Sequence, residues 1–285
     1  MKKNYKKRKK ENFLFSIICA TVGMNSGLDR LCESLSSQIY KNFELIICDQ
    51  NNHLLNKKII DKYNNIKIKF IKSRKGLSIA RNKGIETSIG DYLIFLDDDI
   101  KLNKYYLFKI NKILENKKHD IIAYKVVNNN NKSLLRYPKV DCYLSTTYQI
   151  FNSISSVSFV INSKKKLFFN KNLGLGSKNI YQSGEETDFL LNAKRKFNYK
   201  IFFTPSIKII HKSKNISLLH SLKKSFLYGC GWGYVVKKNN LNYSFILSNF
   251  LKIFLNIIYH FLTLNFKKML ISILTFDGRL FSFAK

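Results

Sequence analysis

Acidic residues are scarce in this chain of 285 residues, which has 18 Asp and Glu against 50 Lys and Arg and a formal net charge of +32. Such a charge suits anionic partners, for example a nucleotide diphosphate or the anionic face of a membrane. Arginine, the better bidentate reader of phosphate, is rare, and the sequence has no Cys/His spacing or aromatic and basic repeat of a nucleic-acid module. We therefore expect no nucleic-acid partner.

Cysteine is also limited, because the five cysteines form no CxxC pair and no disulfide framework. Several lie in apolar segments, where a thiol behaves as a small hydrophobic side chain, and this pattern predicts a reducing cytoplasm. Residues 2–10 are basic and precede an apolar stretch, as in a signal peptide. Because that stretch also fits the first strand of a repeating pattern, we interpret residues 1–12 as a disordered basic arm that faces a membrane.

Short apolar segments alternate with amphipathic ones through the first part of the chain. We expect strands at residues 13–21, 43–49, 66–71 and 92–96, and helices at 28–40, 56–63, 77–89 and 105–115. This alternation predicts an α/β fold with a mostly parallel sheet. Further on, a mixed arrangement is expected, with a helix at 185–197 and strands at 121–127, 155–161, 200–203 and 207–210.

The sequence becomes helical and aromatic from Ser217 onward. Residues 243–264 are about long enough for one membrane span, but polar residues interrupt them. We interpret them as an amphipathic helix on a bilayer or against a partner, and the alternative is an ordinary helix that covers the core. The glycine-rich segment around Trp232 is either a flexible acceptor loop or a site of tight helix packing.

Three adjacent aspartates, Asp97, Asp98 and Asp99, follow the strand predicted at 92–96. Neighbouring carboxylates raise one another's pKa, and a divalent cation relieves that cost. The alternative is a turn or a helix cap. In parallel sheets ligands bind at the carboxyl ends of the strands, and Thr21 and Asp49 are expected at the same edge.

Four segments in register resemble the successive blocks of the family 2 glycosyltransferases over roughly residues 13–105. They are the strand leading to Thr21, the strand ending in Asp49, GLSIARNKG from Gly76 and GDYLIFLDDD from Gly90. A further block lies near Gly184. The resemblance implies a metal-dependent enzyme that transfers a sugar from a nucleotide-diphosphate sugar with inversion.

The implied architecture is a GT-A type, Rossmann-like, mostly parallel sheet flanked by helices, with a helical C-terminal appendage. We expect a glycosyltransferase domain at residues 13–212, divided into a nucleotide-binding half at 13–105 and an acceptor half at 106–212. Residues 213–285 are the aromatic C-terminal region, for which peripheral membrane association at the inner face is one interpretation.

The Asp-x-Asp block of this family implies a divalent cation, Mn²⁺ or Mg²⁺, at Asp97 and Asp99. Carboxylate oxygens suit such cations, and the cation stabilises the leaving diphosphate. His211 stands where some related enzymes have a further ligand, although a lone His is often structural. Asp98 occupies the variable middle position and is expected near the nucleotide sugar with Asp97.

The resemblance also implies nucleotide contacts by Thr21, Asp49 and Arg81. A carboxylate at Asp49 can accept the ring N–H of uracil or guanine, which favours a UDP or GDP donor. The family usually continues with a second acid and Gly-Ser, whereas this chain has Gln50-Asn51-Asn52, and Asp49 could instead be a turn residue.

A second acidic cluster, from Glu185 to Asp188, opens the helix predicted at 185–197. Acids in a first helical turn are favoured by the helix dipole alone, which is one interpretation. In the other, one carboxylate removes the proton of the acceptor hydroxyl. The resemblance aligns Glu186 with the catalytic Asp of the family, and Asp188 is the rival candidate.

The leading hypothesis is therefore a glycosyltransferase acting on a glycan or lipid-linked acceptor in surface polysaccharide synthesis. One alternative is a nucleotidyltransferase, which shares strand-end carboxylates and a metal. The other is a noncatalytic basic protein that binds membranes or nucleic acid.

Overall fold

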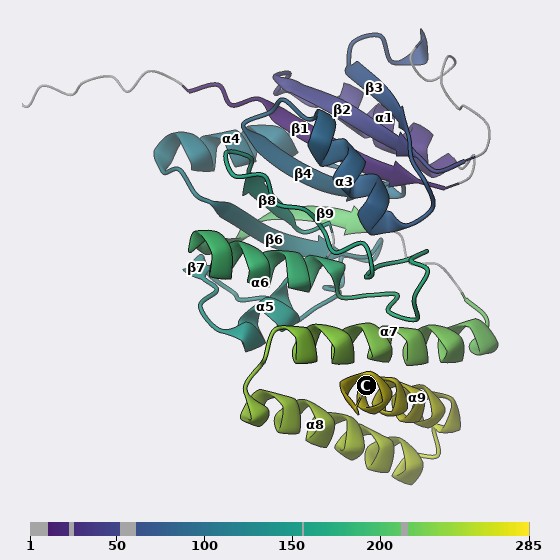
Figure 1. The fold of residues 1–285 in the computed structure, drawn as a ribbon. Coiled ribbons are helices and arrows are strands. Elements are labelled where there is room, and N and C mark those ends of the chain that lie inside the picture. The colour runs from purple at the N-terminus through teal and green to yellow at the C-terminus, as the bar shows by residue number, and fades with distance from the viewer. Residues whose placement is uncertain (1–10, 23–25, 52–60, 156, 212–215, 285) are drawn as a thin grey trace, which may run out of the picture.

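The computed structural model describes residues 11–22, 26–51, 61–155, 157–211 and 216–284. Figure 1 shows a sheet covered by helices on both faces, with three further helices packed at one side. The helix expected at 56–63 and the basic arm at 1–12 lie largely outside the described residues.

One mixed sheet forms the centre of the described chain, in the order β3-β2-β1-β4-β8-β6-β9-β5, with β7 paired to β9. The strands are β1 (Phe15–Thr21), β2 (Phe43–Asp49), β3 (Lys67–Lys72), β4 (Tyr92–Asp97), β5 (Ile100–Lys101), β6 (Ile121–Val127), β7 (Cys142–Tyr143), β8 (Phe159–Asn162) and β9 (Ile201–His211). The helices are α1 (Ser26–Ser36), α3 (Leu77–Thr87), α4 (Tyr106–Asn116), α5 (Thr147–Ser153), α6 (Glu185–Phe197), α7 (Leu218–Lys238), α8 (Tyr243–Leu262) and α9 (Phe266–Ala284).

The first four strands are parallel, which requires crossover connections, and α1 and α3 form two of these between β1 and β2 and between β3 and β4. β1 and β2 are apolar and buried along almost their whole length, since helices cover both faces of the sheet. Leu31 of α1 and Ile110 of α4 belong to the core on one face, while Ala80 of α3 and Phe189 of α6 belong to the core on the other. The predicted α/β fold is confirmed.

The expectation of two short strands around Pro205 is wrong. β9 runs through Pro205 without a break and pairs in parallel with β6. The register shifts between Tyr124 and Lys125, opposite the proline region. Proline has no N–H for the ladder, and an irregularity of this kind lets a strand accommodate it.

The glycine-rich segment around Trp232 lies inside α7, so the loop interpretation is wrong and tight helix packing is confirmed. A Cβ on Gly229 would lie 2.6 Å from the carbonyl oxygen of Thr275 in α9, and one on Gly278 would lie 2.1 Å from that of Phe226 in α7. The two backbones therefore approach more closely than any larger residue would permit.

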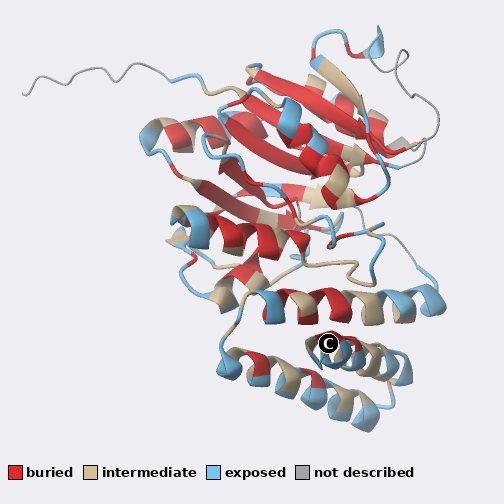
Figure 2. Cartoon of the chain, in the orientation of Figure 1, coloured by how far each residue is buried: buried red, intermediate tan, exposed pale blue. Residues whose placement is uncertain are grey.

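α8 does not cover the sheet. It packs against α9 and contributes Ile246 to a small cluster around Trp232, and α7 separates this unit from the sheet (Figure 1). Ile246 and Ile253 are its buried residues, and most of its other residues are exposed (Figure 2). The interpretation of this segment as a helix covering the core is wrong.

Candidate active site

The carboxyl ends of β1, β2 and β4 bring three sequence-predicted residues together. Thr21 pairs with Asp49 across β1 and β2, and Ala20 pairs with Asp97 across β1 and β4. The Thr21 hydroxyl donates a hydrogen bond of 2.6 Å to Asp98 Oδ2. The strand ends therefore join into one polar edge, as the sequence predicts.

Asp49 is buried at this edge and has a local partner. Its Oδ1 accepts a hydrogen bond of 2.9 Å from the backbone N–H of Asn51 and another from the Asn51 side-chain amide. This is the geometry of an Asx turn. The turn interpretation thus has a structural basis, and the nucleotide role of Asp49 stays a prediction.

The pairing of β5 with β9 carries His211 to the aspartates, because Ile100 lies opposite His211 in this antiparallel ladder. His211 Nε2 lies 3.3 Å from Asp99 Oδ1 and 3.8 Å from Asp97 Oδ2. One donor atom from each of the three lies within 4.8 Å of the others. Two carboxylate oxygens and an imidazole nitrogen at this spacing fit a divalent cation such as Mn²⁺. Burial raises the pKa of Asp97, and Arg81 and His211 oppose the rise.

Arg81 joins the two acidic clusters. Its side chain is fully buried; its Nη2 donates a 3.0 Å hydrogen bond to Asp97 Oδ1, and its Nη1 lies 3.7 Å from Glu185 Oε1. The guanidinium also lies over the rings of Phe169 and Phe95, at 5.5 and 6.0 Å from their centroids. A buried charge of this kind is stable only when it is paired. Arg81 therefore has a fixed position between β4 and α6.

The acids at the start of α6 differ from each other in their surroundings. Gly184, in a left-handed conformation with φ of 86°, starts the helix and turns Glu185 towards Arg81. Burial, and next the neighbouring Glu186 carboxylate, raise the pKa of Glu185 to about 8. Burial raises the pKa of Glu186 as well. The raised pKa values mean that the two carboxyl groups hold protons more tightly than ordinary carboxylates do.

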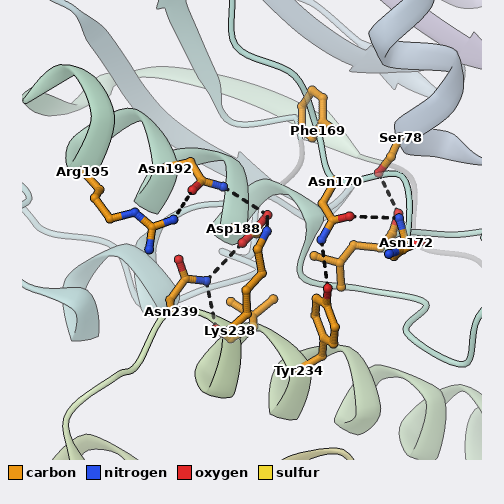
Figure 3. A network of polar contacts seen from close by, with 12 residues as sticks. Ser78, Phe169, Asn170, Asn172, Asp188, Asn192, Arg195, Tyr234, Lys238 and Asn239 are labelled. Carbon is orange, nitrogen blue, oxygen red and sulfur yellow. Dashed lines mark hydrogen bonds and ion pairs between the residues drawn. The ribbon is translucent and has the colours of Figure 1, made fainter.

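Asp188 has a different set of contacts, drawn in Figure 3. Its carboxylate is fully buried and pairs with Lys238 Nζ at 2.7 Å. It also accepts hydrogen bonds from Asn239 at 3.0 Å and from Asn192 at 3.3 Å. Lys238 and Asn239 come from the end of α7, so this contact fastens the C-terminal helices to α6. No pattern in the sequence indicates these two partners.

A cavity of about 450 Å³ lies between the start of α6 and the helices α7 and α9. Glu186 lines it, together with Tyr228, Trp232, Lys224 and Arg279. Burial, then Glu185 and Glu186, raise the pKa of Tyr228, which is consistent with its position near the acids. No sequence motif marks Tyr228 or Arg279, because both lie within helices whose packing the sequence pattern does not reveal.

This architecture is that of the GT-A glycosyltransferases. The S. aureus TarS fragment 1–349 matches with a TM-score of 0.60 and 17% sequence identity, over 81% of this chain and 67% of the TarS chain. The same fragment in complex with UDP-GlcNAc matches with a TM-score of 0.59, 16% identity and coverage of 79% and 71%. At this level of identity the likeness concerns the fold alone.

Residues 16–173 match the model described as glycosyl transferase family 2, and the chain belongs to this family. The resemblance found in the sequence is confirmed. The match ends before α6 and β9, so Glu186, Asp188 and His211 lie outside it.

Curated relatives agree with this assignment. The chain is 25% identical over 233 residues to the cholesterol galactosyltransferase of Borreliella burgdorferi, covering 74% of this chain and 64% of that protein. It is 39% identical over 88 residues to the UDP-Glc:alpha-D-GlcNAc-diphosphoundecaprenol beta-1,3-glucosyltransferase WfaP of Escherichia coli, covering 30% of this chain and 35% of WfaP. The chain thus spans less than two thirds of the length of either relative.

Proposed function

We propose that this glycosyltransferase moves a sugar from a nucleotide-diphosphate sugar to a glycan or lipid-linked acceptor, in a metal-dependent reaction that inverts the anomeric centre. The observation that carries the proposal is the cluster of Asp97, Asp99 and His211 beside the buried Arg81. The carboxylate of Asp49 favours UDP or GDP as the nucleotide. The names of WfaP and of the TarS complex, which contain UDP-Glc and UDP-GlcNAc, support UDP.

The charges at the strand ends suit this reaction. Breaking the bond between sugar and diphosphate leaves negative charge on the nucleotide, which a bound divalent cation stabilises as a Lewis acid. Asp97, Asp99 and His211 are the residues that would hold the cation. Arg81 adds a permanent positive charge next to them, held in place before the donor arrives. The hydrogen bond from Thr21 to Asp98 stabilises the conformation of the turn after β4.

Glu186 is the base that we favour for the acceptor hydroxyl. Glu186 lines the cavity, where an acceptor would approach. Its raised pKa brings its proton affinity closer to a neutral working pH, which suits a general base. Both oxygens of Asp188 are already engaged, by Lys238 and by an amide, so Asp188 would have to break these contacts to act.

A membrane-bound acceptor is supported by α8. Tyr243–Leu262 has the length and apolar composition of a membrane-crossing helix, and only 11% of its most apolar window is buried. Leu247 and Leu262 are 70% and 73% exposed. The basic charge of the chain favours an anionic surface. We therefore propose peripheral attachment to the inner, cytoplasmic face of a membrane, consistent with the lipid-linked substrate in the name of WfaP.

The test combines donor binding with donor hydrolysis. UDP, GDP and their sugars are screened by thermal shift with Mn²⁺, because a ligand that binds only the folded state raises its stability. We expect UDP-sugar hydrolysis to fall about 10²–10³-fold in Asp99→Ala, as for the loss of a group that stabilises the transition state. Asp277→Ala, which removes an exposed acid of α9, is the charge-matched control. Hydrolysis that persists undiminished in EDTA and in Asp99→Ala would contradict the proposal.

A further inference from the structure

The close packing of α7 and α9 places an arginine in the cavity beside Glu186. Gly229 and Gly278 bring the two helix backbones together, and Arg279 follows Gly278 at the crossing. The guanidinium carbon of Arg279 lies 4.2 Å from the ring centroid of Trp232. This cation–π contact holds the guanidinium against Trp232, and both residues line the cavity.

Arg279 has no anionic partner among the residues that the structure describes. Its Nε is buried without a hydrogen-bond acceptor, and no described carboxylate forms an ion pair with it. Burial lowers the pKa of Arg279 to about 10, so the side chain remains charged at neutral pH. Arg279 is partly buried, and a charge withdrawn from water without a partner destabilises a fold unless a ligand compensates it. Arg81, which is fully buried, has two carboxylates for that purpose.

The rest of the cavity adds positive charge and apolar surface. Lys224 lines it, with its Nζ 4.9 Å from the ring centroid of Tyr228. Glu186 is the acidic residue among the lining side chains, and its raised pKa reduces its negative charge. A volume of about 450 Å³ falls in the range of small-ligand pockets.

We propose that Arg279 and Lys224 form a subsite for a phosphate or diphosphate group of the acceptor. The subsite rests on the proposed function, since it assigns the cavity to the acceptor whose hydroxyl Glu186 deprotonates. The donor diphosphate is assigned to Arg81 and to the cation that Asp97, Asp99 and His211 would hold, and none of these residues lines the cavity. An anion at Arg279 would hold the acceptor so that a hydroxyl can reach Glu186. Arginine suits this task because its planar fork binds phosphate oxygens in pairs.

The only tryptophan of the chain provides a direct readout, because Trp232 stacks on Arg279. Its fluorescence is followed in EDTA during titration with inorganic pyrophosphate, farnesyl diphosphate and farnesol. We expect saturable changes with both diphosphates and a weaker response to farnesol. In Arg279→Gln the affinity for both diphosphates should fall at least about tenfold, because a charge-assisted bidentate contact is lost. Lys224→Gln should lower it less.

The control is Lys223→Gln, which removes the same charge from the neighbouring, exposed position of α7 and should bind as the wild type does. Thermal unfolding without anions checks folding, and Arg279→Gln should be at least as stable as the wild type because a buried unpaired charge is gone. Pyrophosphate should then raise the unfolding temperature of the wild type and not that of Arg279→Gln.

The two diphosphates distinguish the source of the anion. Tighter binding of farnesyl diphosphate supports a lipid-linked acceptor, and equal or tighter binding of pyrophosphate supports a soluble phosphate ester at the same subsite. Wild-type affinity in Arg279→Gln, or farnesol binding as tight as that of farnesyl diphosphate, would overturn the inference. UDP-sugar hydrolysis by the wild type with Mn²⁺ is measured in parallel. Its absence would count against the proposed function without touching the anion subsite.

Discussion

The edge at the strand ends and the C-terminal helices differ in which kinds of side chain they expose to water. At the edge, the charged Arg81 is withdrawn from water and paired with Asp97 and Glu185. In the C-terminal unit, large apolar side chains such as Leu247 and Leu262 are left in water. The first arrangement keeps charges in place for a charged ligand. The second exposes surface that gains free energy only by contact with another apolar phase, such as a bilayer. The first region therefore pairs its charge within the chain, and the second leaves apolar surface exposed for the membrane contact proposed above.

The sharpest way to test the first region is to change the two rival bases separately. We expect Glu186→Gln to lower kcat for sugar transfer about 10²–10⁴-fold with donor affinity kept, since a general base is lost. Asp188→Asn should mainly lower thermal stability, because Lys238 then faces a neutral partner. Steady-state kinetics and thermal unfolding of both variants separate the two effects. The reverse result, with activity lost only in Asp188→Asn, would make Asp188 the base.

The packing of the C-terminal helices depends on the crossing of α7 and α9. A Cβ at position 278 would lie 2.1 Å from the Phe226 carbonyl oxygen. We expect Gly278→Ala to lower the free energy of unfolding by about 1–3 kcal/mol, since the helices must move apart. Leu280→Ala, at an exposed position of the same helix, should change it by less than about 0.5 kcal/mol. Equal effects in denaturant unfolding would mean that the crossing is not closely packed in solution.

The buried acids should make stability depend on pH. Because the pKa of Glu185 is raised to about 8 in the folded chain, the folded state binds more protons than the unfolded state above the ordinary carboxyl pKa. Stability from this group should therefore fall as the pH rises from about 4.5 to 8, by at most about 1.4 kcal/mol per pH unit. In Glu185→Gln the free energy of unfolding should depend less on pH. Denaturant unfolding at several pH values measures this dependence. The same dependence in the wild type and in Glu185→Gln would contradict the expectation.

The smallest effect is expected at the exposed face of α8. Leu251 and Leu255 are 53% and 54% exposed and lie one helical turn apart. Replacing both by Ser should weaken binding to anionic vesicles about tenfold or more, since apolar area no longer enters the interface. Val140→Ser, at an exposed apolar position outside the C-terminal helices, is the control. Co-sedimentation with vesicles measures the binding. Equal binding by the double Leu251 and Leu255 variant and by Val140→Ser would mean that α8 does not contact the membrane.

The sheet could be predicted well because its strands are buried on both faces. β2 and β6 have the predicted bounds, and so does α6, since an apolar run or a helical repeat bounded by polar residues leaves little choice. β9 was divided wrongly at Pro205, because a sequence does not show that a bulge within the strand, between Thr204 and Lys208, accommodates the proline. The two-residue strands β5 and β7 are too short to produce a periodic signal.

Residues of the candidate site could be predicted where both the residue type and its place in the sequence indicate a site. Asp97 and Asp99 are unusual in a basic chain and follow a buried strand, so the sequence alone marks them. Their contact with His211 depends on the pairing of β5 with β9, which no local pattern indicates. The partners of Asp188 and the exposure of α8 likewise arise from how helices pack. The sequence therefore predicted the acids of the site better than the residues that hold or complete them.

The pairing of Ile100 with His211 also affects when the site forms while the chain is synthesised from its N-terminus. The segment matched by the family ends at residue 173, before α6 and β9 have emerged. A nascent chain of that length has the first parallel strands but lacks His211, Glu185 and Glu186. Contacts between residues so far apart in sequence form late and slowly. The part that matches the family is thus made first, and the cluster of Asp97, Asp99 and His211 is complete only after β9 has been added to the sheet.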